Sequence, residues 1–184
     1  MRSKTALVPI ADGSEDIEAV CIIDVLRRAG IEVTVASVMP NEQLEITAAR
    51  KTRIVADAHI SQCVDQSYDL IALPGGLPGA EHLRDCPVLI ELLKSQKNSG
   101  RWFAAICASP AVVFASHGLE REFVTTAHPG FTDKLSQFRN DRVVLDRNCI
   151  TSQGPGTALE FSLALVEALL GTEKRAEVAA PMVL

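Results

Sequence analysis

Cys107 is the side chain of this sequence best suited to act as a nucleophile. It lies between the apolar run Trp102–Ile106 and residues 108–114, which are typical of the first turns of a helix, with Pro110 at a position that a helix start tolerates. A strand that turns sharply into a helix at one reactive side chain is a nucleophile elbow. The free N–H groups and positive dipole of the helix start favour a thiolate there. The alternative is a small buried hydrophobic residue, the usual state of a free cysteine.

Glu18 is the acid that could act with this cysteine. On the predicted first helix it shares a face with Cys21, Ile22 and Val25. A carboxylate among apolar side chains is costly unless it is hydrogen-bonded or protonated, although a glutamate at the edge of the face can also reach water. If Glu18 reaches Cys107, two adjacent anions repel, so a thiolate requires Glu18 to keep its proton. The protonated acid could then donate a hydrogen bond to the thiolate and act as a proton shuttle.

An oxyanion hole and a base are the other parts that such a site needs. Gly75 and Gly76 follow a predicted strand, and their N–H groups, with that of Ala108, could bind an oxyanion, although a plain tight turn is the alternative. His128 is held in an extended loop by the proline after it and could be a base or a surface histidine. No metal is predicted, because the remaining histidines have no metal-ligand spacing with another histidine or cysteine. These are His59, His82 and His117.

The elements that must position these residues alternate between strand and helix. A strand at Thr5–Ile10, a helix from a Ser14 cap to Arg28 and a strand at 31–38 form a unit that implies a parallel sheet. Further strands are predicted at 68–73, 102–106, 123–127, 143–145 and 149–151, and a hairpin around Ile46 and 53–55. Further helices are predicted at 77–83, 87–99 and 157–170, the last with a Thr157–Glu160 capping box.

We therefore predict one flavodoxin-like α/β domain over residues 1–184, a three-layer sandwich of a mostly parallel sheet with helices on both faces. Its site should lie outside the carboxyl ends of the strands. The first helix is apolar around much of its circumference and carries an expected Asp24–Arg28 ion pair, so we predict a homodimer with this helix in the interface.

Composition excludes several classes of protein. The chain has 184 residues, 47% of them hydrophobic, and a net charge of −5, which argues against a stable complex with nucleic acid. No apolar run approaches the length of a membrane span, and the N-terminus does not resemble a secretory signal. Five cysteines without C-x-x-C spacing argue against disulfides and structural zinc, so we expect the reducing cytoplasm.

Several motifs recur in this order and at similar spacing in a known family: ADGSEDIEA, DVLRRAGIEVTVA, LPGG, AICASP, VTTAHPG, TSQGPGTALEF and APMVL. On these motifs the sequence resembles the ThiJ/PfpI superfamily, and most closely its YajL branch. The resemblance covers nearly the whole chain. It implies a flavodoxin-like sandwich and a homodimer formed through the first helix.

The resemblance also assigns roles to residues. It implies that Cys107 is the nucleophile, that Glu18 is the protonated carboxyl and that His128 lies near the cysteine without forming a full triad. Its oxyanion donors match Gly75, Gly76 and Ala108, and its positions near the pocket and across the dimer match Asp24, Arg28, Arg50 and Pro181, the last approaching the partner's pocket.

The activity implied by the resemblance needs no cofactor. It is a glutathione-independent glyoxalase and a deglycase of proteins and nucleotides modified by glyoxal or methylglyoxal, releasing lactate or glycolate. A redox-sensing chaperone in oxidative stress is the alternative. A peptidase is disfavoured, because Ala108 stands where the peptidase-like branch has a histidine. Ser109 stands where relatives have a smaller residue, and its hydroxyl could bond near the elbow or cap the helix.

Overall fold

A seven-stranded sheet forms the middle of the molecule in the computed structural model, which describes residues 2–184. Its strand order is β5-β2-β1-β6-β7-β9-β8, and all neighbours are parallel except β8 and β9. The strands are β1 (Thr5–Ile10), β2 (Glu32–Ser37), β5 (Ala58–His59), β6 (Leu70–Leu73), β7 (Trp102–Ile106), β8 (Val143–Asp146) and β9 (Cys149–Ser152). The hairpin of β3 (Glu45–Thr47) and β4 (Arg53–Val55) stands apart from this sheet, as predicted.

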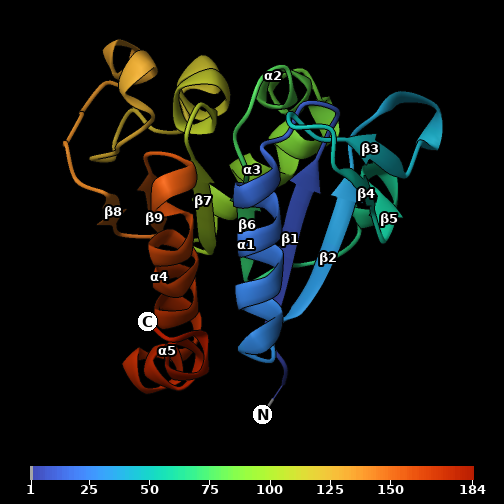
Figure 1. Ribbon diagram of the computed structural model, residues 1–184. Coiled ribbons are helices and arrows are strands. Elements are labelled where there is room, and N and C mark those ends of the chain that lie inside the picture. Colours follow the sequence, from blue (N-terminus) through green and yellow to red (C-terminus); the bar gives the residue numbers. More distant parts are fainter. Residues whose placement is uncertain (1) are drawn as a thin grey trace.

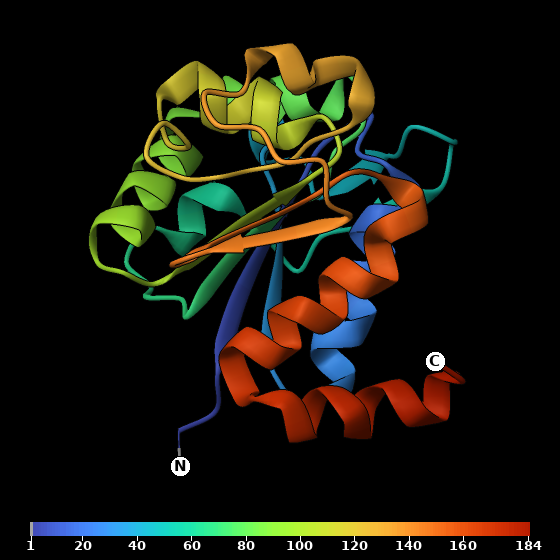
Figure 2. The ribbon, with the colours of Figure 1, turned by 90° about the vertical axis from the view of Figure 1, so that its left-hand side faces the viewer.

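Helices cover both faces of the sheet, which confirms the predicted flavodoxin-like sandwich. Helices α1 (Asp16–Arg28) and α4 (Ala158–Leu170) pack side by side on one face (Figure 1). Helices α2 (Gly79–Arg84) and α3 (Pro87–Asn98) lie on the other face, and the edge-on view separates the two helical layers (Figure 2). Helix α5 (Thr172–Ala179) follows α4 at the end of the chain. No helix within residues 2–184 is both long and apolar enough to cross a membrane.

The central strands are apolar along their whole length because both of their faces are covered. All four residues of β6 are buried, as are the last four of β7. Phe103 on β7 packs its ring against Phe114 and Phe123 at centroid distances of 5.2 and 5.3 Å. This packing fixes the strand that leads to the elbow, since a close-packed core resists small displacements.

Residues 123–127 do not form the predicted strand. The pairing there is a single bridge between Thr125 and Phe138. Both edges of strand β9 are already paired, with β7 on one side and β8 on the other. Two N–H groups of this segment bond to side chains instead, Val124 to Asp146 (2.8 Å) and Thr126 to the Thr151 hydroxyl (2.9 Å).

The predicted helix caps are also wrong in two places. The Ser14 hydroxyl accepts from the N–H of Ala11 and closes the turn after β1, while the Glu15 carboxylate accepts from the N–H of Glu18 and caps α1. At α4 the Thr157 hydroxyl donates to the Gly154 carbonyl. The other half of that predicted box, Glu160, forms an ion pair with Arg142 at 2.7 Å. The neighbouring turns thus take the hydroxyls of Ser14 and Thr157, and an ion pair distant in sequence takes Glu160.

Candidate active site

Cys107 occupies the sharp turn that follows β7. Its φ of 65° lies in the left-handed region, where a residue with a side chain is strained. Two hydrogen bonds fix this backbone: its N–H donates to the carbonyl of Ser152 on β9 (3.0 Å), and its carbonyl accepts from the N–H of His128 (2.8 Å). The residue is 9% exposed. The elbow predicted from the sequence is therefore present, with its side chain almost covered.

Glu18 is completely buried on the first turns of α1. Its Oε2 accepts a hydrogen bond from the N–H of Gly75 at 2.7 Å. Its Oε1 has no hydrogen-bond partner within residues 2–184. Burial raises the pKa of Glu18 from 4.5 to about 7, against the smaller lowering effects of the Gly75 N–H and of the hydrogen bond with Cys107. The acid can therefore hold a proton near neutral pH, and the alternative of a glutamate reaching water is wrong.

Burial also raises the pKa of the thiol. Burial, the charge of Glu18 and the hydrogen bond to Glu18 raise the pKa of Cys107 to about 12, against the smaller lowering effect of the N–H groups of Gly76 and Ala108. The N–H groups thus favour a thiolate, as expected, but burial and Glu18 outweigh them. While Glu18 is ionised the thiol keeps its proton, so a thiolate forms only when the proton moves to Glu18. The two groups titrate as one pair that carries one negative charge near neutrality.

Residues 75 and 76 must be glycines because neighbouring atoms leave no room for a Cβ at either position. A Cβ on Gly75 would lie 2.6 Å from the Cβ of Cys107 and 2.9 Å from Oε2 of Glu18. Gly76 has a φ of 87°, and a Cβ there would lie 2.4 Å from the carbonyl oxygen of Gly13. The loop therefore presents bare backbone to the cysteine. Because the N–H of Gly75 already donates to Glu18, only two of the three predicted oxyanion donors remain at the sulfur: Gly76 and Ala108.

Ser109 joins this loop to the elbow. Its buried hydroxyl donates to the carbonyl of Pro74 at 2.6 Å. The bond links the residue before Gly75 to the residue two positions after Cys107 in space, although they are 35 positions apart in sequence. Of the two alternatives for this hydroxyl, bonding near the elbow is correct, and it makes no cap hydrogen bond.

The backbone of His128 is hydrogen-bonded to the cysteine, but its ring is not. Its exposed ring accepts the N–H of Gly130 at Nδ1 (3.1 Å) and packs edge-on against Phe131. The contact between His128 and Cys107 that the structure does show is the backbone hydrogen bond at 2.8 Å. A ring turned toward its own loop does not form a triad with the thiol.

The four support residues do not gather at the cysteine. Asp24 and Arg28 form the predicted ion pair on the exposed side of α1 at 2.5 Å. Arg50 lies nearer the site, because its N–H donates to the Asp16 carboxylate at the start of α1 (2.7 Å). Pro181 belongs to the last turn of the chain, and the C-terminus lies at the opposite end of the sheet from the elbow (Figure 2).

Asp16 is a supporting residue that the sequence did not reveal. Its carboxylate accepts from the N–H groups of Arg50 (2.7 Å) and Thr52 (3.2 Å). Burial acts to raise the pKa of Asp16, but the Thr52 hydroxyl and these N–H groups together lower it. Asp16 thereby fixes the β3–β4 hairpin to the turn of α1 that carries Glu18. The sequence signal for Asp16, an acid in the first turn of a helix, points equally to a dipole contact. No group of three or more side chains suited to a metal occurs within residues 2–184.

Comparisons with known proteins agree with this architecture. The family model described as "DJ-1/PfpI family" matches residues 4–168. The Parkinson disease protein 7 homolog of Danio rerio is 42% identical over 190 residues, covering 100% of this chain and 99% of that protein. The glutathione-independent glyoxalase DJR-1.2 of Caenorhabditis elegans is 40% identical, covering 100% and 97%.

Two further comparisons show how much of the chain is similar to known proteins. The protein DJ-1 homolog B of Arabidopsis thaliana is 51% identical over 170 residues, which are 91% of this chain but only 38% of that protein, so the chain spans well under half of that relative's length. The structure of oxidized Toxoplasma gondii DJ-1 superposes with a TM-score of 0.96 at 44% identity, with 98% of each chain covered.

Proposed function

Because this chain belongs to the DJ-1/PfpI family, we propose that it is a cysteine-dependent enzyme of 2-oxoaldehyde chemistry. Its activities are those of a glutathione-independent glyoxalase and of a deglycase acting on early adducts of methylglyoxal or glyoxal with proteins and nucleotides. The observation that carries the proposal is the buried pair of Cys107 and Glu18. The relative named as a glyoxalase, which this chain matches over its whole length, supports the substrate class.

The reaction begins with the proton of the pair on Glu18 and the charge on Cys107. The sulfur attacks the aldehyde carbon of methylglyoxal, and the N–H groups of Gly76 and Ala108 stabilise the oxygen that becomes negative. Glu18 donates its proton to that oxygen, which gives a hemithioacetal. This first step needs an acid whose pKa is near neutral, and burial supplies one at about 7.

The second step moves hydrogen between neighbouring carbons. The Glu18 carboxylate removes the proton from the carbon bonded to sulfur and returns it to the adjacent carbon, while the hydroxyl proton on the sulfur-bound carbon moves to the oxygen of the former ketone. The former ketone thereby becomes an alcohol and the sulfur-bound carbon a thioester. Water then cleaves the carbon–sulfur bond, releases lactate and restores the thiol. Glyoxal gives glycolate by the same route. Atoms balance as one aldehyde plus one water, and no cofactor takes part.

Loss of the nucleophile tests the proposal. We expect Cys107→Ala to abolish methylglyoxal consumption, and Cys86→Ala, which alters a half-buried cysteine at the start of α3, to retain it. Circular dichroism and thermal unfolding establish that both variants fold. Turnover by folded Cys107→Ala at the unaltered rate would refute the assignment.

A redox sensor is the second candidate, and Oε1 of Glu18 favours it. This oxygen is buried and has no fixed hydrogen-bond partner in the described chain, so when protonated it can donate to an oxygen added to the Cys107 sulfur. Mass spectrometry after mild peroxide, set against the rate of methylglyoxal turnover, separates the two candidates. Oxidation of Cys107 without measurable turnover would favour the sensor.

We also propose that two copies associate through α1. Ile17 and Val20 are 53% and 48% exposed on this helix, beside the Asp24–Arg28 ion pair. Large apolar side chains that gather on one exposed face mark a contact surface. Five free cysteines are consistent with a reducing compartment, and we place the protein in the cytoplasm.

A further inference from the structure

A hollow lies at the amino ends of β6 and β7, at the opposite end of these strands from Cys107. It measures about 600 Å³, a size that falls within the range of small-ligand sites. Helix α3 forms one wall and the loop before β6 forms the other. Its lining includes Arg101, the serines Ser67 and Ser95, and the apolar side chains of Val64, Val88 and Leu92.

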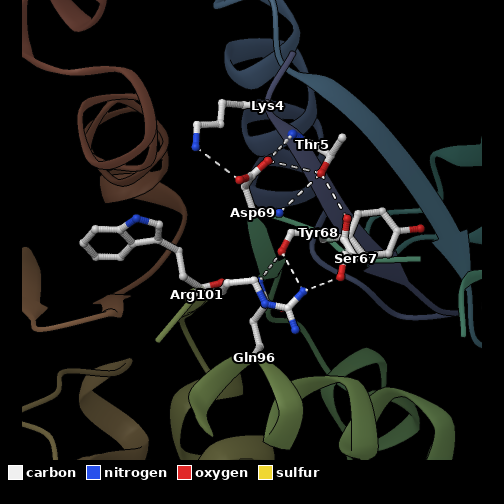
Figure 3. A network of polar contacts seen from close by, with 8 residues as sticks. Lys4, Thr5, Ser67, Tyr68, Asp69, Gln96 and Arg101 are labelled. Atoms are coloured by element: carbon white, nitrogen blue, oxygen red, sulfur yellow. Dashed lines mark hydrogen bonds and ion pairs between the residues drawn. The ribbon is translucent and has the colours of Figure 1, made fainter. Parts of the chain in front are cut away.

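Arg101 stands at one end of this hollow without an acidic partner. Its guanidinium donates to the hydroxyls of Ser99 (2.8 Å), Ser67 (3.0 Å) and Ser95 (3.2 Å), and to the carbonyl of Tyr68 (3.4 Å). Figure 3 shows the side chain reaching toward Ser67 and the main chain of Tyr68. All of these partners are neutral, so a half-buried positive charge is left without compensation.

The other half-buried arginines are paired differently. Arg84 bonds to Asp85 at 2.7 Å, and Arg175 bonds to Glu167 at 2.5 Å. Within residues 2–184, Arg101 forms no ion pair with a carboxylate. An arginine prefers a carboxylate, which it can bind through two parallel hydrogen bonds. No carboxylate of the described chain balances the charge of Arg101, and one N–H of its Nη2 stays free to meet an anion.

Two serine hydroxyls extend this anion site. Ser67 and Ser95 accept hydrogen bonds from the guanidinium, which leaves the hydrogen of each hydroxyl free to donate. Lys4 adds positive charge nearby, although Asp69 already pairs with it at 3.1 Å (Figure 3). An oxygen anion beside Arg101 would meet a guanidinium and two hydroxyl donors together.

The rest of the hollow combines an apolar part with acidic side chains and disfavours a second anionic group. Val64, Val88 and Leu92 supply the apolar part of the lining. Asp65 lies on the lining, and Glu91 already pairs with Lys94 at 2.8 Å, so a second anionic group would face negative or neutral surroundings. The ligand chemistry that fits is one anionic end and one apolar body.

We propose that this hollow binds a small amphipathic monocarboxylate. Its carboxylate pairs with Arg101, Ser67 and Ser95, and its hydrocarbon part lies against Val88 and Leu92 on α3. The site is independent of the chemistry proposed for Cys107, and it shares no residue with that site.

Nuclear magnetic resonance titration of the full chain with octanoate tests this site. We expect saturable shifts confined to amides of residues 64–68 and 88–102, and roughly tenfold weaker binding of octan-1-ol and of the dicarboxylate octanedioate. Arg101→Gln should weaken octanoate binding by a factor of about ten or more, the effect of one charged hydrogen-bonding partner. Arg139→Gln, which removes a surface arginine paired with Asp141, is the matched control and should bind as the unaltered protein does.

Val88→Trp provides a second test that leaves Arg101 in place. Val88 is half-buried on α3 and lines the hollow, so the indole ring of the tryptophan would fill the hollow and should abolish the shifts. The proposal is overturned if octanoate does not bind, if octan-1-ol binds equally well, or if Arg101→Gln or Val88→Trp binds like the unaltered protein. Shifts centred on Cys107 in place of α3 would also overturn it.

Discussion

The proton shared by Cys107 and Glu18 gives a direct prediction for the titration of the thiol. In the intact pair the first proton leaves near the Glu18 pKa of about 7, and the second near the Cys107 pKa of about 12. If the proton moves between the two groups, part of the thiolate must form already in the first step. The ultraviolet absorbance of the thiolate should therefore rise in two steps as pH increases. The size of the first step measures the fraction of the singly charged pair in which Glu18 holds the proton.

Glu18→Leu removes the first step. Without the carboxyl, the charge and hydrogen bond that raise the pKa of Cys107 disappear, while burial still opposes the thiolate. A single titration above the ordinary value of 9.0 should remain. Moving the onset of thiolate formation from about 7 to above 9 is a change of at least two units, or about 3 kcal/mol of lost stabilisation of the thiolate form.

Glu18→Gln is the informative companion variant. Its amide can donate a hydrogen bond to sulfur but carries no charge and no mobile proton. We expect a single step that lies below that of Glu18→Leu. Subtracting the titration of Cys107→Ala removes the signal of the other cysteines, and circular dichroism defines the pH range in which the fold persists.

One result would refute this reasoning. If the unaltered protein showed no thiolate absorbance near pH 7 and a single step near pH 12, the proton would stay on sulfur and the charge on Glu18. Cys107 would then not be a thiolate at the pH of the cell, and the proposed attack on an aldehyde would lose its nucleophile.

Other perturbations test the same arrangement. The pKa of Glu18 in the folded state is raised from 4.5 to about 7, so the folded state binds more protons than the unfolded state between these values. The resulting contribution to the free energy of unfolding, about 3 kcal/mol, is complete below pH 4.5 and is lost as pH rises through 7. Denaturant unfolding of Glu18→Gln should not show this loss. Ser109→Ala should lower the unfolding free energy by about 1–3 kcal/mol, because it leaves the buried Pro74 carbonyl unpaired, and should reduce kcat more than it raises KM. Gly75→Ala should nearly abolish activity, because its Cβ would lie 2.6 Å from the Cβ of Cys107; the matched substitution Gly100→Ala meets no neighbouring atom within 4 Å and, despite its positive φ, should leave turnover intact. Val20→Arg should shift the protein toward monomer in sedimentation measurements if α1 forms the dimer contact.

Local sequence predicted the elements that carry the site because their signals are local. The apolar run before Cys107, the glycine pair after β6 and the apolar face around Glu18 each follow from neighbours within a few positions. The carboxyl ends of parallel strands meet at one edge, so these pieces could be placed together before any contact was known. The observed elbow has the positive φ that such a turn requires.

The remaining details depend on partners distant in sequence. Whether the Ser109 hydroxyl caps a helix or joins two loops is decided by Pro74, 35 positions away. The use of the Gly75 N–H by Glu18 is likewise a contact across 57 positions, and it removes one donor from the predicted oxyanion hole. No pattern within a single segment contains such information.

The direction of the thiol pKa was wrong for a related reason. The sequence shows a helix start after Cys107, which favours a thiolate, but it does not show how deeply the sulfur is buried or which charge it faces. In the folded chain both burial and Glu18 outweigh the N–H groups of Gly76 and Ala108. Reactivity therefore depends on the position of one proton and not on the helix alone.

The two carboxyl oxygens of Glu18 are not equivalent, and this determines where that proton lies. Oε2 already accepts the N–H of Gly75 at 2.7 Å, so a proton on Oε2 would compete with that bond. Oε1 has no such partner within residues 2–184, and a buried carboxylate oxygen without a donor is unfavourable. A proton on Oε1 removes this penalty, while Oε2 keeps its hydrogen bond from Gly75. The hydrogen bond from Gly75 thus orients the acid so that its unpaired oxygen is the one that takes up the proton of the pair.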